Sequence, residues 1–282
     1  MTTQATSRPR PGMMRFIRRE PGLVLGLALL ALLLTIAFFP WLFTSHSPFA
    51  IEVGNAMLPP SANHWFGTDD VGRDTYARVI YGTRVTLAIC AGSLFLSAMI
   101  GGVLGLISGF FSGWLDMAFG RIVDVLLSFP PIVLGVIITG VLGPDINNLI
   151  LALSIVYMPV FFRIARAGAI AEAGKTYVEA AHSVGVHPVA ILLFHIARNV
   201  LPLIIAQYMI LFPMILQIQA ALGFLGLGVQ PPTPDWGAIL EYGKDYVLFA
   251  PWMSLFPGLA ILIAALALML VGRSVQRRMD ER

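Results

Sequence analysis

The stretch TYVEAAHSVGVHP, from Thr176 to Pro188, separates two long hydrophobic runs. Thr176 and Glu179 predict a capping box, in which each side chain binds the backbone N–H of the other residue. Gly185 predicts a left-handed cap at the end of this helix, and Pro188 suits the first turn of a second helix. One apolar stripe follows at helical spacing: Tyr177, Ala180, Ala181 and Val184. The stretch therefore predicts a short capped helix outside a membrane, shaped for contact with another protein.

The composition sets the class of protein. Of the 282 residues, 57% are hydrophobic and 12% charged, against roughly 25% charged in soluble domains. The mean hydropathy of +0.82 indicates more apolar surface than a soluble core could bury. The chain is therefore expected to be an all-α polytopic membrane protein. Its single cysteine, Cys90, excludes an intrachain disulfide.

Hydrophobic runs long enough to cross a bilayer as helices recur along the chain. The first follows several arginines, but it exceeds the apolar length of a secretory signal and no clear cleavage site follows, which favours an uncleaved span. Six transmembrane helices are predicted, near residues 22–43, 86–111, 122–142, 146–162, 200–225 and 250–272.

The basic residues predict the orientation of these spans. With the N-terminus inside, the outer segments hold only Arg73, Arg78, Arg84 and Lys244 of the 18 lysines and arginines. Both termini are therefore expected in the cytoplasm. The predicted organisation is a cytoplasmic N-terminal segment 1–21, a permease domain 22–272 with outer loops 44–85 and 226–249 and a cytoplasmic loop 163–199, and a cytoplasmic tail 273–282.

Three separated motifs resemble one family. Glu179-Ala180-Ala181, followed by Gly185, resembles the EAA loop of binding-protein-dependent ABC importer permeases. HWFGTDDVGRDTYARVIYGTRVTL (His64 to Leu87) and GFLGLGVQPPTPDWG (Gly223 to Gly237) resemble signatures of the C-type subunit of dipeptide and oligopeptide permeases. With LPPSANHWFGTD upstream and APWMSLFPGLAI in the last span, the resemblance covers nearly the whole chain.

This resemblance implies the type I ABC importer (MetI-like) permease fold in a prokaryotic inner membrane. It also implies a homologous B-type permease, two ABC ATPase subunits and an external solute-binding protein as partners. ATP and Mg²⁺ would bind the partner ATPases, so no cofactor is expected on this chain. Peptides lead as the solute, although relatives of this architecture also carry nickel chelates, glutathione and opines.

The same resemblance assigns roles to particular residues. Those expected to couple the chain to the ATPases are Thr176, Tyr177, Glu179, Ala180, Ala181, Gly185 and His195. Those expected to dock the binding protein are Asp69, Asp70, Arg73, Asp74 and Trp236. Polar side chains within the spans are candidates for the substrate path, with hydrogen bonding between helices as the alternative: Gln207, Tyr208, Gln217, Gln219, Ser154 and Tyr157.

Several other patterns are rejected. AIAEAGKT, from Ala169 to Thr176, matches a relaxed phosphate loop, but the segment between spans is too short for the domain that such a loop needs. DDVGRD lacks the spacing of a calcium loop, and no constellation supports a metal at His182, His187 or His195, so no metal site is predicted. Catalytic pairs and a nucleic-acid surface are also missing, so the chain is not expected to be an enzyme.

From the sequence alone, the function keeps two alternatives, and the path of the chain after the EAA loop is open. An ion-coupled secondary transporter or channel that needs no ATPase is the alternative function, although the mid-span positions carry no charge. An intramembrane enzyme is a further alternative, which lacks a supporting motif. Ala197 and Arg198 depart from the family pattern after the EAA loop, and the next proline is Pro202. The path from the second cytoplasmic helix into the fifth span is therefore undetermined.

Overall fold

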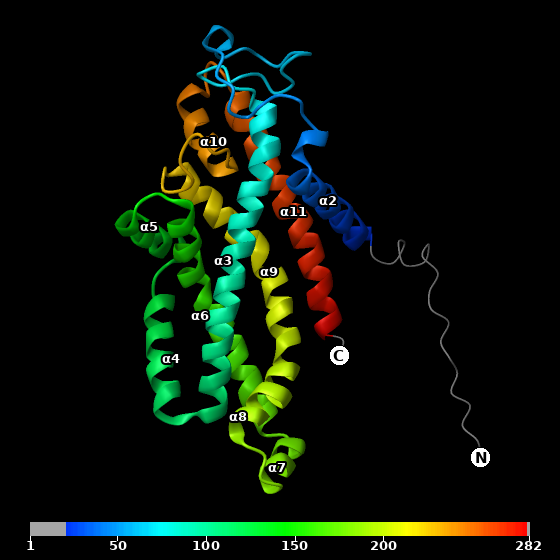
Figure 1. The fold of residues 1–282 in the computed structure, drawn as a ribbon, viewed down its shortest axis with the longest axis vertical. Helices are drawn as coiled ribbons and strands as arrows, with labels where there is room; N and C mark the ends of the chain where they lie inside the picture. Colours follow the sequence, from blue (N-terminus) through cyan, green and yellow to red (C-terminus); the bar gives the residue numbers. More distant parts are fainter. Residues whose placement is uncertain (1–20, 281–282) are drawn as a thin grey trace, which may run out of the picture.

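The computed structural model describes residues 21–280, and helices dominate this part of the chain (Figure 1). The helices are α2 (Pro21–Phe38), α3 (Thr75–Phe111), α4 (Gly113–Leu127), α5 (Pro131–Leu142), α6 (Ile146–Ala173), α7 (Thr176–Ser183), α8 (Pro188–Ala190), the π-helix η3 (Ile191–Ile196), α9 (Ala197–Phe224), α10 (Trp236–Gly243) and α11 (Trp252–Asp280), with short 3₁₀ turns at Pro40–Leu42, Val53–Asn55 and Lys244–Tyr246. Residues 21–280 contain no β-strand.

Within residues 21–280, five helices are long and apolar enough to cross a membrane: α2, α3, α6, the continuous stretch Pro188–Phe224 and α11. The third predicted span, residues 122–142, is wrong as one straight helix, because α4 and α5 meet at an angle of 95°. Pro130 and Pro131 cause this break. Neither has a backbone N–H to donate, and a proline disfavours helical geometry in the residue before it. The six predicted spans are therefore five helices and one bent pair.

Several predicted boundaries also shift. α3 begins at Thr75, inside the predicted outer loop 44–85, because the Asp74 carboxylate caps it by accepting the Ala77 N–H at 2.6 Å. α6 continues to Ala173, into the predicted loop 163–199, and α11 extends into the predicted tail. The N-terminal segment lies outside the described residues, apart from Pro21.

α3 and α6 pack side by side along the centre of the bundle (Figure 1). α3 places a small residue at every fourth position of this contact: Ser93, Ser97, Gly101, Gly105 and Gly109. A Cβ on Gly101, Gly105 or Gly109 would press on the backbone of α6. Helices approach this closely in a membrane through small residues, because lipid supplies little hydrophobic drive for their association.

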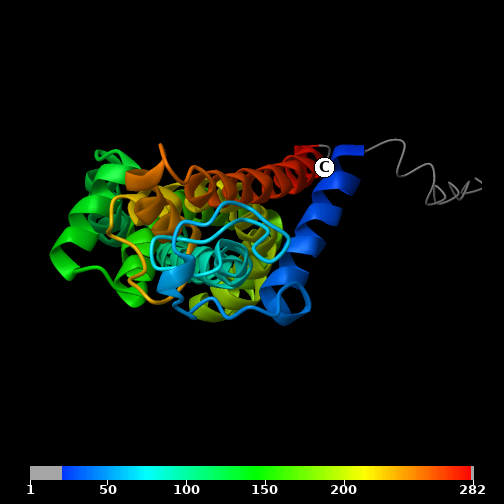
Figure 2. The ribbon, with the colours of Figure 1, turned by 90° about the horizontal axis from the view of Figure 1, so that it is seen from above.

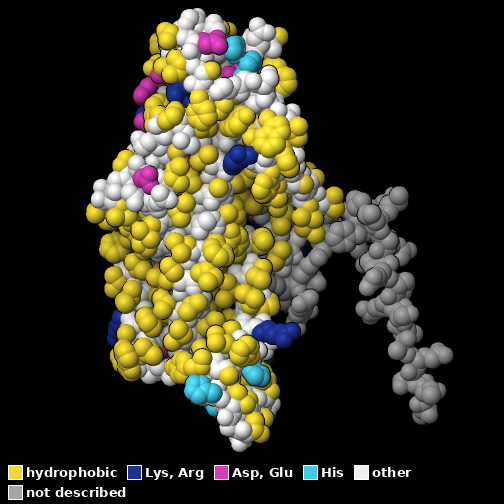
Figure 3. Space-filling view, viewed as in Figure 1, with side chains coloured by type: hydrophobic (Ala, Val, Ile, Leu, Met, Phe, Trp, Pro, Cys, Tyr) yellow, Lys and Arg dark blue, Asp and Glu magenta, His cyan; other side chains and the backbone are white. Residues whose placement is uncertain are grey.

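The bundle has two distinct ends. α7 and α8 lie beyond its lower end in Figure 1, while α10 and the loop before α3 lie at its upper end. Seen from above, α2 crosses α11 at the edge of the bundle (Figure 2). Hydrophobic side chains cover the long middle part of the face in Figure 3, and the histidines lie at its two ends. This distribution suits a body in lipid with both ends in water.

Candidate functional site

α7 ends in a Schellman motif. Gly185 has a φ of +81°, and its N–H donates to the His182 carbonyl at 3.0 Å. The next N–H, of Val186, reaches back to the Ala181 carbonyl at 3.1 Å. These are the two bonds that satisfy the last carbonyls of a helix with a left-handed cap. The predicted cap at Gly185 is confirmed, and the chain turns sharply into α8, where Pro188 occupies the first turn as predicted.

The predicted start of α7 is wrong in detail. Lys175, not Thr176, is the N-cap residue, and no side chain caps this end. The Lys175 carbonyl accepts the Val178 N–H at 2.9 Å, so the helix begins one residue earlier than the capping box requires. The buried face of α7 also differs from the predicted apolar stripe. Val178, outside the stripe, is buried, whereas Val184, in the stripe, is 79% exposed.

A polar network joins α7 to the two long helices beside it. One carboxylate oxygen of Glu172, in α6, accepts the Tyr177 hydroxyl at 2.6 Å and the Asn199 amide at 3.1 Å. Asn199, in α9, also donates to the Tyr177 hydroxyl at 3.0 Å, and Lys175 binds the other Glu172 oxygen at 2.5 Å. Burial, and then the bond to Glu172, raise the pKa of Tyr177. α6, α7 and α9 therefore meet at one hydrogen-bonded point.

Sequence reasoning missed Glu172 because it lies in the rejected stretch AIAEAGKT. A carboxylate at the end of an apolar helix, five residues before a tyrosine, was the available signal. The role of Glu172 becomes visible only when the fold brings Asn199, 27 residues later in the chain, beside it.

The predicted coupling residues divide into two groups. Tyr177 and Ala181 are half-buried and hold α7 against the bundle. The others are exposed and available to a partner: Thr176, Glu179, Ala180, Gly185 and His195. α8 then continues through η3 into α9, so the path left open by Ala197 and Arg198 is an unbroken helical stretch with a π-helical segment before Ala197.

At the other end, the acidic loop before α3 is held by ion pairs. Asp69 is 5% exposed, and its carboxylate lies 2.6 Å from the Arg73 Nε and 3.7 Å from the Arg78 Nε. The same carboxylate accepts the backbone N–H groups of Val71 and Arg73. Asp70 is only partly buried. Of the predicted docking residues in this loop, Asp70 alone offers a side chain toward solvent, and the others build the loop.

Asp235 and Trp236 form a second buried network at this end. Asp235 accepts the Thr86 hydroxyl at 2.7 Å and the Gln219 amide at 2.8 Å, and it caps α10 by accepting the Gly237 and Ala238 N–H groups. Burial raises the pKa of Asp235, and these four donors oppose the rise.

Trp236 is fully buried, and its indole N–H donates to the Val79 carbonyl at 2.9 Å. The prediction that Trp236 docks the binding protein is therefore corrected. A buried indole with its donor satisfied fixes α10 to α3 rather than meeting a partner.

The predicted path residues also divide. Gln219 is fully buried against Asp235, and Ser154 donates across the α3 contact to the Ser93 carbonyl at 3.1 Å. Tyr208 donates to the Ala91 carbonyl of α3 at 2.9 Å. These three side chains therefore make hydrogen bonds to neighbouring elements. Such bonds were the alternative role predicted for polar residues within the spans. Tyr157 is buried, Gln207 is half-buried and Gln217 is exposed.

One cluster at the α10 end was not foreseen. His46, His64 and Asp74 bring ring nitrogens and a carboxylate oxygen within 4.8 Å of one another. His46 and His64 are 18 residues apart in the chain, and neither forms a metal-binding spacing with Asp74, so no local pattern indicates this cluster.

Comparison with known proteins decides the family. Residues 101–282 match the family described as "Binding-protein-dependent transport system inner membrane component". The chain belongs to this family. It is 37% identical to the dipeptide transport system permease protein DppC of Alkalihalophilus pseudofirmus, over 94% of this chain and 87% of that protein.

Other relatives are similarly close. The probable D,D-dipeptide transport system permease protein DdpC of Escherichia coli is 40% identical, over 88% of this chain and 83% of that protein. The glutathione transport system permease protein GsiD of Pectobacterium atrosepticum is 35% identical, over 94% and 88%. The chain is therefore a multi-pass membrane protein and a permease subunit of an ABC importer, with the resemblance to the dipeptide and oligopeptide permeases confirmed.

Proposed function

We propose that this permease carries short peptides or similar small solutes into the cell, and that α7 receives the driving movement from cytoplasmic ATPases. A homologous B-type permease completes the path, and an external solute-binding protein delivers the solute. ATP and Mg²⁺ bind the ATPases, so this chain needs no cofactor for transport and hydrolyses no ATP. It acts as the coupling and path-forming part of the assembly.

The position of α7 carries this proposal. It lies beyond the end of the bundle, and Thr176, Glu179 and Ala180 are exposed on it. Its inner side is bound to α6 and α9 through Glu172, Tyr177 and Asn199. A push on the exposed side is thus passed to two long helices at one point. Coupling of this kind requires the contacts of α7 to differ between inward-facing and outward-facing states.

The distribution of charge supports a cytoplasmic position for α7. Arg163, Arg166 and Lys175 lie at this end, on α6 or just after it. Cytoplasmic segments of membrane proteins carry an excess of lysine and arginine. Both termini are then cytoplasmic, and the α10 end faces the binding protein.

The solute class rests on the relatives. Two of those named above are dipeptide permeases and one is a glutathione permease. The substrates in all three names are small and peptide-like. For the path, Gln207 and Gln217 are the glutamines of α9 that buried hydrogen bonds do not already occupy in the described structure. They supply the amide groups that a peptide backbone can pair with.

The test is a pair of substitutions on α7. Glu179→Ala removes an exposed charge, and Gly185→Ala places a Cβ at a φ of +81°, a strain of about 1 kcal/mol. Both should lower solute uptake at least ~10-fold, a change of about 1.4 kcal/mol in coupling. Uptake is measured in cells, and ATPase subunits recovered with the affinity-purified chain report assembly.

Matched controls separate coupling from folding. Gly174→Ala changes a glycine whose φ is −80°, and Glu52→Ala removes an exposed carboxylate at the other end. Both should transport normally. Normal uptake and normal ATPase recovery in Glu179→Ala and Gly185→Ala would contradict the proposal.

A further inference from the structure

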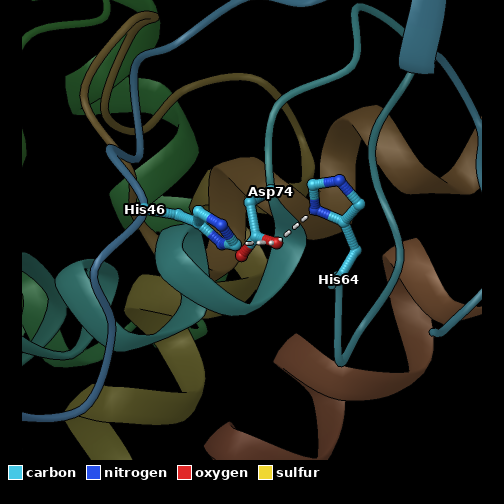
Figure 4. Close-up of side chains that lie close together, drawn as sticks. All are labelled: His46, His64 and Asp74. Carbon is cyan, nitrogen blue, oxygen red and sulfur yellow. Dashed lines mark hydrogen bonds and ion pairs between the residues drawn. The ribbon is translucent and has the colours of Figure 1, made fainter. Parts of the chain in front are cut away.

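His46, His64 and Asp74 converge from three separate segments (Figure 4). His46 follows the 3₁₀ turn after α2, His64 lies in the loop before α3, and Asp74 caps α3 itself. Their side chains are 48%, 17% and 5% exposed, respectively. Both rings are aimed at one carboxylate oxygen, Asp74 Oδ2, and lie with their centroids 5.4 Å apart.

The three side chains stand close enough for one ion to reach an atom of each. The Nδ1 atom of His64 lies 2.8 Å from Asp74 Oδ2, and the Nδ1 atom of His46 lies 3.5 Å from the same oxygen. Ligands bound tetrahedrally at about 2.0–2.1 Å stand about 3.3 Å apart. Binding an ion would therefore open the His64–Asp74 contact by about 0.5 Å, and a small turn of the exposed His46 ring would close its contact with Asp74 by about 0.2 Å.

The surroundings leave Asp74 free to bind a cation. Its second oxygen, Oδ1, accepts the Ala77 N–H at 2.6 Å, which fixes the carboxylate. Arg73 and Arg78 pair with Asp69 instead. The backbone of His64 is held by Ser61, whose hydroxyl accepts the His64 N–H at 3.1 Å. The bond to Asp74 orients a ligand side chain, as outer bonds do in metal sites, and the bond to Ser61 fixes the backbone that carries His64.

A cavity of about 330 Å³ opens beside the cluster, lined in part by His46, Asp74, Thr44, Asn63 and Tyr76. It has room for water or a small donor at a fourth position. Three protein ligands and an open fourth position distinguish this arrangement from a closed structural zinc site.

From these observations we infer that His46, His64 and Asp74 form a binding site for a divalent late transition metal, with Zn²⁺ as the reference ion. Two imidazoles and one carboxylate suit Zn²⁺, Ni²⁺ or Cu²⁺ and not Mg²⁺ or Ca²⁺, which take oxygen ligands. A bound ion would join the segment after α2 to the start of α3. It would also present a Lewis-acidic position to the cavity.

The test uses the full-length chain in detergent, purified through a tag without histidines. The chain is loaded with Zn²⁺ and desalted, and retained zinc is measured by mass spectrometry. Affinity is measured by competition with a chromogenic chelator. One zinc per chain is expected, and excess Mg²⁺ or Ca²⁺ should not displace it. Co²⁺ in its place should give visible absorption typical of four or five ligands.

Substitutions assign the site. His46→Ala, at an exposed position, should weaken zinc binding at least ~10-fold without changing elution or helical circular dichroism. His46→Cys should restore most of the affinity, because a thiolate replaces the lost ligand. His187→Asn, at the far end of the molecule, should bind zinc normally. The inference is overturned if the wild-type chain retains no stoichiometric zinc, if His46→Ala and His64→Ala both retain it fully, or if His187→Asn abolishes it.

Discussion

The two ends of the bundle use their sequence motifs in opposite ways. At the α7 end, Glu179 and Ala180 stand in solvent on a short helix that buries only Val178. At the α10 end, Asp235 and Trp236 are completely buried and bonded to α3 and α9. Motifs that look equally suited to docking are thus exposed at one end and form a buried framework at the other. In the proposed assembly, a partner at the α10 end would meet a surface that Asp235 and Trp236 shape without touching it themselves.

The comparison predicts the largest loss of stability for Asp235→Ala. This change removes an acceptor shared by Thr86, Gln219 and two N–H groups of α10. Leaving these buried donors without a partner should cost about 3–5 kcal/mol. Thermal unfolding in detergent measures it, with the exposed Asp245→Ala as the control. If both variants melt together, the α10 end is not a framework.

A second prediction concerns the packing of α3 against α6, the two long helices that run between the two ends. In Gly105→Ala, the new Cβ would meet the Phe162 carbonyl and Ala165 of α6. This overpacking should destabilise the bundle by about 1–3 kcal/mol. Gly120→Ala, where nothing lies within 4 Å of the new Cβ, should instead be neutral or gain up to about 1 kcal/mol. The same unfolding measurement compares them, and equal destabilisation would mean that helix propensity rather than α3–α6 packing governs both.

A smaller and more local effect is expected at the α7 end. Tyr177→Phe removes the hydroxyl that links Glu172 and Asn199, a loss of about 0.5–1.5 kcal/mol. Because the rest of the bundle does not depend on this bond, hydrogen exchange of the α7 amides should speed up while the melting temperature hardly moves. Tyr246→Phe, at the other end, should leave α7 exchange unchanged. Unchanged exchange in Tyr177→Phe would show that other contacts hold α7.

Much of this fold can be predicted from the sequence because each signal is local. Long apolar runs predict spans, and Gly185 and Pro188 predict the turn between two short helices. The bend between α4 and α5 also has a local cause, Pro130 and Pro131. It is missed because residues 122–142 are hydrophobic enough on average to predict one span despite the two prolines. The small residues of α3 signal close packing, yet they do not say which helix packs there.

The sites were harder to predict because they depend on contacts distant in sequence. Asp235 and Thr86 are 149 residues apart, and Glu172 and Asn199 are 27 apart. A tryptophan after an outer turn reads as a docking side chain until its burial is known. Gln219, a polar residue in a span, is predicted to line the substrate path until its hydrogen bond to Asp235 is known. Local patterns indicate which residues matter, whereas their exposure comes from the fold.

Cysteine labelling tests exposure directly and needs no loss of stability. Val184 is 79% exposed at the α7 end, and Ala238 is 5% exposed at the α10 end. A membrane-impermeant maleimide should modify Val184→Cys at least ~10-fold faster than Ala238→Cys, because buried thiols react slowly. Wild-type Cys90, fully buried, should stay unmodified until the chain unfolds. Comparable rates in purified chain would mean that α10 opens readily, so that its buried residues reach a partner after all.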